Sequence, residues 1–298
     1  MQGKSGRHLR ASAAPLVIAG FLATAAFAAE LTPKTTKAFD HYVRVREIQI
    51  AEELRDGQKF FWFDQLPEPR RQKIYEQLRE GQILIERLET LEENKQIRIP
   101  NGLVHHWVGG AFIPRATLEQ TLAVVQDYDH HEIIYRPDVR HSKLLGRDGD
   151  NFQVSMQLYK KTIVTTAVNA QFDVRYFTLG GSRAYSQSHS TRIAEVKDLG
   201  KPGEHELPVG QDHGYLWRMD SYWRFYEKDG GVYIQVESIG LSRGVPAIFA
   251  WLVRPLLSRI PRETLSHLLI RTRETVISKN KAAYLAGQEA EGTEAAMD

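Results

Sequence analysis

Histidine is the residue type in this sequence best suited to acid–base or metal chemistry, and the chain has 11 of them. His105–His106 and His130–His131 are adjacent pairs. Adjacent residues on a strand point to opposite faces, so neither pair can chelate one ion from a strand. A third group lies in residues 200–214: Glu204, His205, Glu206, Asp212 and His213. It lacks the i, i+4 spacing of a helical metal site, so we expect a solvated loop and no metal.

Motifs for nucleophilic catalysis and cofactor binding are missing as well. The sequence has no cysteine, which excludes thiolate zinc sites, cysteine nucleophiles and dithiol redox chemistry. It has no G-x-S-x-G elbow of a serine hydrolase. Gly109-Gly110 and Gly180-Gly181 are isolated pairs and form no phosphate-binding loop. We therefore expect no cofactor.

Composition places the chain among ordinary globular proteins. Of 298 residues, 42% are hydrophobic and 26% are charged, which excludes disordered and collagen-like chains. The net charge of +2 gives no electrostatic reason to expect nucleic-acid binding, which needs basic residues clustered on one face. A chain of this length buries roughly 75% of its unfolded surface and needs no metal or disulfide to hold its core.

The first 28 residues have the layout of a secretory signal peptide. A basic start (Lys4, Arg7 and Arg10) is followed by an uncharged stretch and by Ala26-Phe27-Ala28, an A-x-A ending. We expect cleavage after Ala28 and export of the mature chain, either to a periplasm or out of the cell. Of these two compartments a bacterial periplasm fits better, because the chain has no disulfides. An uncleaved anchor is the alternative, because the 19 uncharged residues 11–29 approach the roughly 20 that a spanning helix needs.

Residues 29–99 are expected to form a helical N-terminal region. One helix is predicted to end near Gly57, and a second follows Pro69, with apolar residues at helical spacing: Ile74, Leu78, Ile85 and Leu88. Between them lie four consecutive aromatic residues, 60–63. We expect them to pack this region onto the main domain, because aromatic side chains dominate core energetics. A surface for a partner or a membrane is the alternative.

From residue 100 to residue 280 the hydrophobic period changes to that of strands. A strand near 103–112 and a helix after Pro114 precede alternating segments near 152–158, 164–176, 184–196 and 215–225. Asp229-Gly230-Gly231 predicts a hairpin into one more strand. Pro261 is expected to begin a C-terminal amphipathic helix, and the acidic tail 281–298 is expected to be disordered. An antiparallel sheet with one such helix buries best by curling around it, which makes the chain α+β.

Ten residues around the first helix and the second strand add a further pattern: Ile113, Pro114, Ala116, Leu118, Asp127, Tyr128, Tyr135, Pro137, Val139 and Ser142. With the order of elements, this pattern resembles the helix-grip fold of the START-like (SRPBCC) superfamily, which includes polyketide cyclases, plant allergens and lipid-transfer domains. The resemblance covers about 60% of the chain. It implies a cavity between the curved sheet and the last helix that holds an apolar ligand, and it brings no fixed catalytic set.

The predicted ligand-binding residues are those expected to face that cavity. Strand alternation and the helical stripe select Met156, Trp217, Met219, Ser221, Trp223, Phe225, Leu265 and Leu269. The polar strand 184–196 adds Ser188, Ser190 and Arg192, where the guanidinium could bind a carboxylate or phosphate head group. Two alternatives stay open. The apolar residues could fill a solid core, and the polar strand could be a solvated edge.

These observations predict an exported, non-enzymatic carrier of an apolar or amphipathic, lipid-like small molecule. The segment 246–260 is apolar between arginines and could touch a membrane transiently or pack as a buried helix. A cyclase-like or hydrolase-like enzyme in the same cavity is an alternative, with His106, Asp220 or Glu237 as the acid–base group. Another alternative is a module that binds a partner through the 29–99 helices.

Overall fold

The computed structural model describes residues 29–57, 59–161, 165–244 and 247–294. Its α-helices are α2 (Pro33–Asp56), α3 (Glu68–Arg79), α4 (Leu118–Val125), α5 (His131–Ile134) and α6 (Ala247–Glu294), with 3-10 turns η1 (Trp62–Gln65) and η2 (Tyr128–His130). The strands of the main sheet are β2 (Leu84–Arg87), β5 (Gly102–Pro114), β6 (Val139–Asp148), β7 (Asn151–Lys161), β8 (Thr165–Thr178), β9 (Arg183–Lys197), β10 (His205–Glu206), β12 (Arg218–Lys228) and β13 (Gly231–Arg243). Two short pairs, β1 (Ala29–Glu30) with β11 (Gln211–Asp212) and β3 (Leu91–Glu92) with β4 (Lys95–Gln96), lie outside this sheet.

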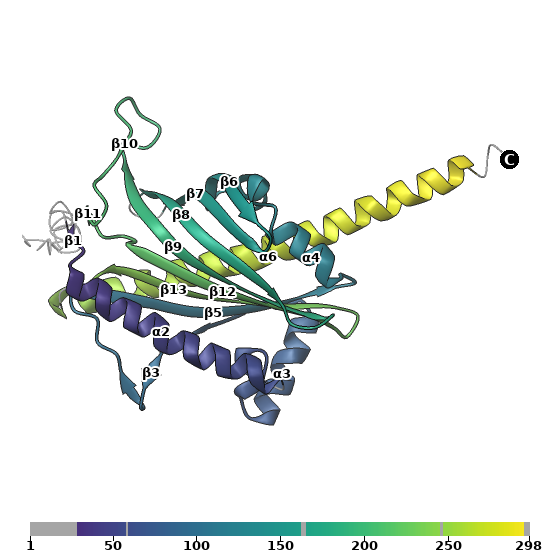
Figure 1. Cartoon of the computed structure of the whole chain (residues 1–298), viewed down its shortest axis with the longest axis horizontal. Coiled ribbons are helices and arrows are strands. Elements are labelled where there is room, and N and C mark those ends of the chain that lie inside the picture. The colour runs from purple at the N-terminus through teal and green to yellow at the C-terminus, as the bar shows by residue number, and fades with distance from the viewer. Residues whose placement is uncertain (1–28, 58, 162–164, 245–246, 295–298) are drawn as a thin grey trace, which may run out of the picture.

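The main sheet is antiparallel throughout its described pairs. Its strands run in the order β2-β5-β13-β12-β9-β8-β7-β6, and β10 adds to β9. The helix α6 lies along one face of the sheet, and α2 crosses the other (Figure 1). We call the face toward α6 the inner face and the face toward α2 the outer face. This arrangement is the helix-grip α+β fold that the sequence predicted.

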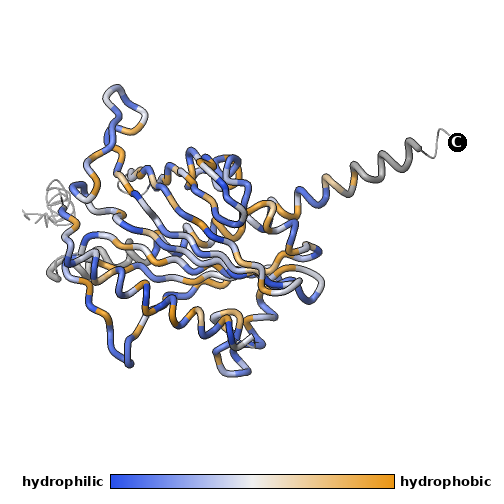
Figure 2. Tube along the Cα trace, in the orientation of Figure 1, coloured by the Kyte–Doolittle hydropathy of each residue, from blue (hydrophilic) through white to orange (hydrophobic). Residues whose placement is uncertain are grey.

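Alternation along the strands gives the sheet two different faces. On β12, Met219, Trp223 and Phe225 pack in the cluster with α6, whereas Tyr222 packs in the cluster with α2. Figure 2 shows hydrophobic and hydrophilic residues following one another closely along the strands. Both faces are covered at the central strands, so each face needs its own packed layer.

A glycine lets α6 approach the inner face closely. A Cβ atom built on Gly109 would lie 2.7 Å from the Leu269 side chain and 2.8 Å from that of Ile85. The helix is also fixed by polar contacts: Arg271 donates to the Ile134 carbonyl at 2.9 Å, and the Tyr135 and Thr272 hydroxyls lie 3.1 Å apart. This part of α6 is therefore an integral part of the core.

The C-terminal helix is longer than the sequence predicted. It begins at Ala247 and not at Pro261, which lies inside it, and it continues to Glu294 through most of the predicted tail. Past Asn280, which donates to Gln120 at 2.8 Å, the helix extends away from the body (Figure 1). The segment 246–260 mostly belongs to this helix, but the side chains of 247–258 lie outside the described part of the chain, as does the predicted signal peptide 1–28.

The N-terminal region packs on the outer face. Phe60, Phe61 and Phe63 are buried against Phe112 and Tyr233 of the sheet, which confirms the packing role predicted for the four aromatic residues. The second predicted helix was too long, because α3 ends at Arg79 before Gly81, whose φ of 89° suits glycine. Residues 84–87 instead form β2, which pairs with β5 at the edge of the main sheet. The first N-terminal helix ends at Gly57 as expected.

Candidate functional site

Nine of the eleven predicted ligand-binding residues lie on the inner face or on the helix that covers it. Phe225, Leu265 and Leu269 are buried in the core under α6. Met156, Met219 and Trp223 pack against the same core but keep part of their surface exposed. The described residues of α6 and of the sheet therefore leave these three side chains incompletely covered.

Three serines lie side by side on adjacent strands in the middle of the inner face, and we call this part of the face the floor. Ser221 of β12 lies opposite Ser188 of β9 and opposite Ser238 of β13. We call these three residues the serine row. Strands lie about 4.8 Å apart, so the row places hydroxyl groups at that spacing over about 10 Å. All three are half-buried, and within the described part of the chain none of their hydroxyls has a hydrogen-bond partner.

The other serines of β9 already have partners. The Ser190 hydroxyl accepts the Met219 N–H at 2.9 Å, where it replaces a ladder hydrogen bond, and its side chain is buried. Ser186 is buried and hydrogen-bonds with Tyr176. Ser190 therefore has a structural task, and the serine row holds the hydroxyls left for a ligand. Ser238 was missed from the sequence, although its alternation with Ile234 and Val236 places it on the same face.

Apolar side chains border the middle serine of the row, Ser221, on both sides along β12. Two residues from Ser221 lie Met219 in one direction and Trp223 in the other, and the Trp223 ring stacks on Phe225 with centroids 5.7 Å apart. At the β5 end of the row, Trp107 lies opposite Ser238. A short line of hydroxyls within an apolar floor suits an amphipathic molecule, because the few polar groups fix its orientation.

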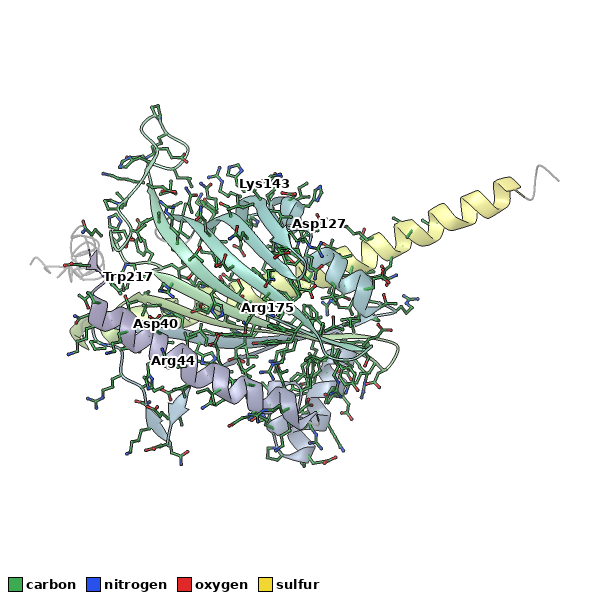
Figure 3. All side chains as sticks on the ribbon, in the orientation of Figure 1. Asp40, Arg44, Asp127, Lys143, Arg175 and Trp217 are labelled. Carbon is green, nitrogen blue, oxygen red and sulfur yellow. The ribbon has the colours of Figure 1, made fainter. Side chains whose placement is uncertain are left out.

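Trp217 does not face the inner side, and its placement corrects the prediction. It packs in the outer-face cluster with Phe39, and its indole N–H donates to Asp212 at 3.0 Å. Figure 3 shows it beside the N-terminal end of α2, near Asp40. Alternation fails there because the Trp217 N–H bonds to the carbonyl of Leu241, the residue already opposite Arg218, so the regular register of β12 begins only after Trp217.

Arg192 is also on the wrong face for the head-group role predicted for it. Between β8 and β9 the register skips one residue, so that Phe172 lies opposite Ser190 and Gln171 opposite Arg192. This bulge returns Ile193 to the inner face and turns Arg192 outward, where it forms an ion pair with Glu206 of β10. The strand β9 itself is central, between β8 and β12, so the solvated-edge alternative was wrong.

The acid–base residues considered for an enzyme lie on the outer face in a buried ion network. Arg46 of α2 binds both carboxylate oxygens of Glu237, at 2.6 and 2.9 Å, and His106 Nε2 lies 2.9 Å from the same carboxylate. Burial alone would raise the pKa of Glu237, but the Arg46 charge and the hydrogen bonds from Arg46 and His106 lower it far below its usual value. Asp220 is buried on this face too, bound to His189. None of these groups can reach a ligand on the inner face.

A surface hollow of about 380 Å³ lies above this network. Its lining is mostly polar: Arg46, Gln49, Glu52, Glu53, Lys59, Trp62, Gln65, Leu88, Glu89 and His106. The charged groups at its base pair with one another, because Glu53 accepts from Arg46 at 2.7 Å and from Arg224 at 2.6 Å. A second hollow, of about 500 Å³, follows one side of α2 between Leu31 and Arg44. Both are on the α2 side of the molecule.

An acid–base pair lies at the far end of the inner face. Glu195 of β9 lies opposite the inner-face residue Val168, and its carboxylate binds His213 Nδ1 at 2.6 Å and the His213 N–H at 3.1 Å. Burial raises the pKa of Glu195. The His213 side chain is one-third exposed. Sequence reasoning had left His213 in a solvated loop, because only the fold brings it to Glu195.

Two further observations concern metals and membranes. Within the described residues, no three histidine, aspartate or glutamate side chains come together as a metal ion would require. No helix in the described part of the chain is long and apolar enough to cross a membrane.

No protein-family model matches this sequence, and no curated protein matches it significantly. Solved structures do match its fold. A STAR-related lipid transfer protein from Xanthomonas axonopodis is 14% identical, with a TM-score of 0.44, over 64% of this chain and 98% of that one. The Zhui aromatase/cyclase from Streptomyces sp. R1128 is 12% identical, with a TM-score of 0.39, over 61% and 98% of the two chains. Human STARD10 is 9% identical, with a TM-score of 0.44, over 73% and 84%. Likenesses at this level say nothing about ligand or activity.

Proposed function

We propose that this protein is an exported carrier that binds an amphipathic, lipid-like small molecule between the inner face of its sheet and α6, without catalysis or cofactor. The observation that carries the proposal is the serine row. Three hydroxyls without protein partners lie in the middle of an apolar floor whose neighbours Met219 and Trp223 are only partly buried. Export is supported by the layout of residues 1–28.

Energetic cost is the reason to assign this floor to a ligand and not to a solid core. The three hydroxyls have no protein partner but still reach solvent, and sealing such a hydroxyl in a solid core without a partner would cost about 1–3 kcal/mol. The exposed parts of Met156 and Met219 also lack the dispersion contacts that a closed core would give them. A bound molecule would avoid this cost, because its apolar body would cover the exposed side chains and its polar group would bind the hydroxyls in place of water.

The test begins with the full chain expressed in a bacterium that exports proteins. Native mass spectrometry of the purified protein should show a chain beginning at Ala29 with a small molecule that organic solvent extracts. Met219→Trp, which fills the floor, should abolish this extra mass, and Ser155→Trp on the open outer face of β7 should keep it. A protein that carries no molecule and binds no added amphiphile would refute the proposal.

An enzyme using the same inner face is the second candidate, and Glu195 with His213 is the observation that favours it. A histidine oriented by a carboxylate is a common general base. This candidate predicts that the molecule extracted from His213→Gln differs chemically from the one extracted from the unaltered protein. A carrier predicts the same molecule from both.

A further inference from the structure

We propose that the polar group of the ligand held at the serine row is uncharged, a hydroxyl or a carbonyl, and that the site selects against carboxylate and phosphate amphiphiles. This inference rests on the proposed function and narrows its ligand class. It replaces the charged head group that Arg192 had suggested.

On the central strands the charged side chains lie on the outer face, and the hydroxyl groups of the serine row lie on the inner face. Within two residues of the serine row, the inner-face positions of β9, β12 and β13 are Ser186, Ser190, Met219, Trp223, Val236 and Gly240. All of them are uncharged. The outer face of the same strands carries Arg224, Glu237, Asp220 and His189, which bind one another or residues of α2. A charged ligand group at the row would therefore meet no counter-charge from these three strands.

The nearest titratable group on the inner face stays neutral. His105 of β5 lies opposite Gly240, two residues from Trp107, and its Nε2 is 2.8 Å from the Ser242 hydroxyl. Burial and the charge of Arg87 lower the pKa of His105 to about 4. At neutral pH this imidazole adds a hydrogen-bonding group to the floor and no positive charge.

Charged side chains on this face lie at its periphery. Glu195 is seven residues beyond Ser188 along β9, about 20 Å away, and is paired with His213. Lys160 is paired with Asp138 at 3.1 Å at the rim of β7. Arg87 extends the row on the edge strand β2, but its exposed side chain lies beyond the buried Trp107. Among the described residues, only Arg87 lies near enough to offer a charge to a ligand, and it would do so at the solvent edge.

Desolvation then decides the preference. Serine hydroxyls can each donate one hydrogen bond and accept others, which matches a hydroxyl or carbonyl group. An ionised carboxylate loses far more hydration on entering an apolar floor, and neutral hydroxyls recover only part of it. The same hydrocarbon chain should therefore bind more tightly with a neutral end.

The experiment compares amphiphiles that share one chain and differ in charge. Titrations of the full protein by calorimetry and tryptophan fluorescence use 1-lauroylglycerol, dodecanoate and dodecyl phosphate, each below its micelle concentration. We expect 1-lauroylglycerol to bind at least tenfold more tightly than either anion. Ser221→Ala and Ser188→Ala should each weaken 1-lauroylglycerol about fivefold, while dodecanoate changes little. Ser155→Ala, on the open outer face, is the matched control.

The outcomes separate this inference from the proposed function. Anions that bind as tightly as 1-lauroylglycerol, above all with a loss of affinity in Arg87→Gln, would overturn the neutral-ligand inference and leave the carrier function standing. Neutral binding that both serine variants leave unchanged would overturn the role of the serine row. Binding of none of the three amphiphiles, with no molecule extracted from the purified protein, would count against the carrier itself.

Discussion

Glu237 is a fully buried carboxylate that joins α2 to the sheet through Arg46. Breaking a buried ion pair on one side usually costs about 3–5 kcal/mol, because the other charge stays buried without its partner. Here Arg46 keeps Glu53 at 2.7 Å, which offsets part of that cost. Removing the charge of Glu237 should therefore lower the free energy of unfolding by an amount near the lower end of this range.

Glu237→Gln is expected to lower the free energy of unfolding at pH 7 by about 3 kcal/mol, measured by urea denaturation. The amide keeps the shape of the side chain and removes its charge from Arg46 and His106. Glu86→Gln is the control, because the Glu86–Arg70 pair is largely exposed, and such pairs contribute about 1 kcal/mol or less. Equal losses in the two variants would show that the buried network adds no stability.

At the level of elements, α2 completes the core and is more than an appended helix. Phe39, Tyr42, Val43 and Ile50 are buried against the outer face, and Arg46 brings the counter-charge for Glu237. Without α2, Tyr222 and Ile239 would be exposed and Glu237 would lose its arginine. This packing explains why the helix is amphipathic, and it weighs against a separate partner-binding module.

Deleting residues 29–57 is expected to abolish cooperative thermal unfolding, followed by circular dichroism, and to give aggregated protein. Deleting residues 285–298 is the control. That segment lies beyond Asn280, where α6 leaves the body, so the melting temperature should change by less than about 2 °C. A stable, monomeric protein without 29–57 would instead favour the partner-binding alternative.

The sequence predicted those elements whose pattern is local. Alternation located β7, β8 and β12, and Asp229-Gly230-Gly231 located the β12–β13 hairpin. The sequence pattern could not predict β2, because Leu84 and Ile85 stand at helical spacing from Ile74 and Leu78 and yet pair with β5. The pairing is decided by contacts with residues more than 20 positions away, and tertiary contacts override a short local pattern.

The candidate site was predicted where the register is regular and missed where it is not. Met219, Ser221 and Trp223 alternate without interruption on β12, so their common face follows from period 2. A one-residue irregularity reverses the face of the residues beyond it on the same strand, which moved Arg192 and Trp217. The Glu195–His213 contact joins residues 18 positions apart through a loop, and no spacing rule encodes it.

For the whole molecule, the buried His131 and the half-buried His105 make stability depend on mildly acidic pH. Burial lowers the pKa of His131 to about 4, and burial with the Arg87 charge does the same for His105. His131 lies between the rings of Tyr128 and Tyr135, and its Nε2 has no hydrogen-bond partner in the described structure. His189 acts in the opposite direction, since its bond to Asp220 raises its pKa and its contribution fades as pH rises.

The sign follows from linkage. His131 and His105 each have a folded pKa below the unfolded value of about 6.5, so the unfolded chain takes up protons first as the pH falls. Their contribution is complete above pH 6.5 and is lost between pH 6.5 and 4, by up to about 3 kcal/mol for each histidine. Glu237 and Glu53, whose pKa values are lowered, add a further loss only below about pH 4.5.

Urea denaturation between pH 7.5 and pH 4.5 should therefore show a steep fall in the free energy of unfolding, and His131→Gln should flatten it. The useful quantity is the slope, because the substitution also changes packing and so shifts the value at every pH. His141→Gln is the control, since the His141 side chain is 74% exposed and should leave the slope unchanged. If His131→Gln keeps the slope of the unaltered protein, His131 is protonated equally in both states, and the acid sensitivity of the fold must come from His105 or from its carboxylates.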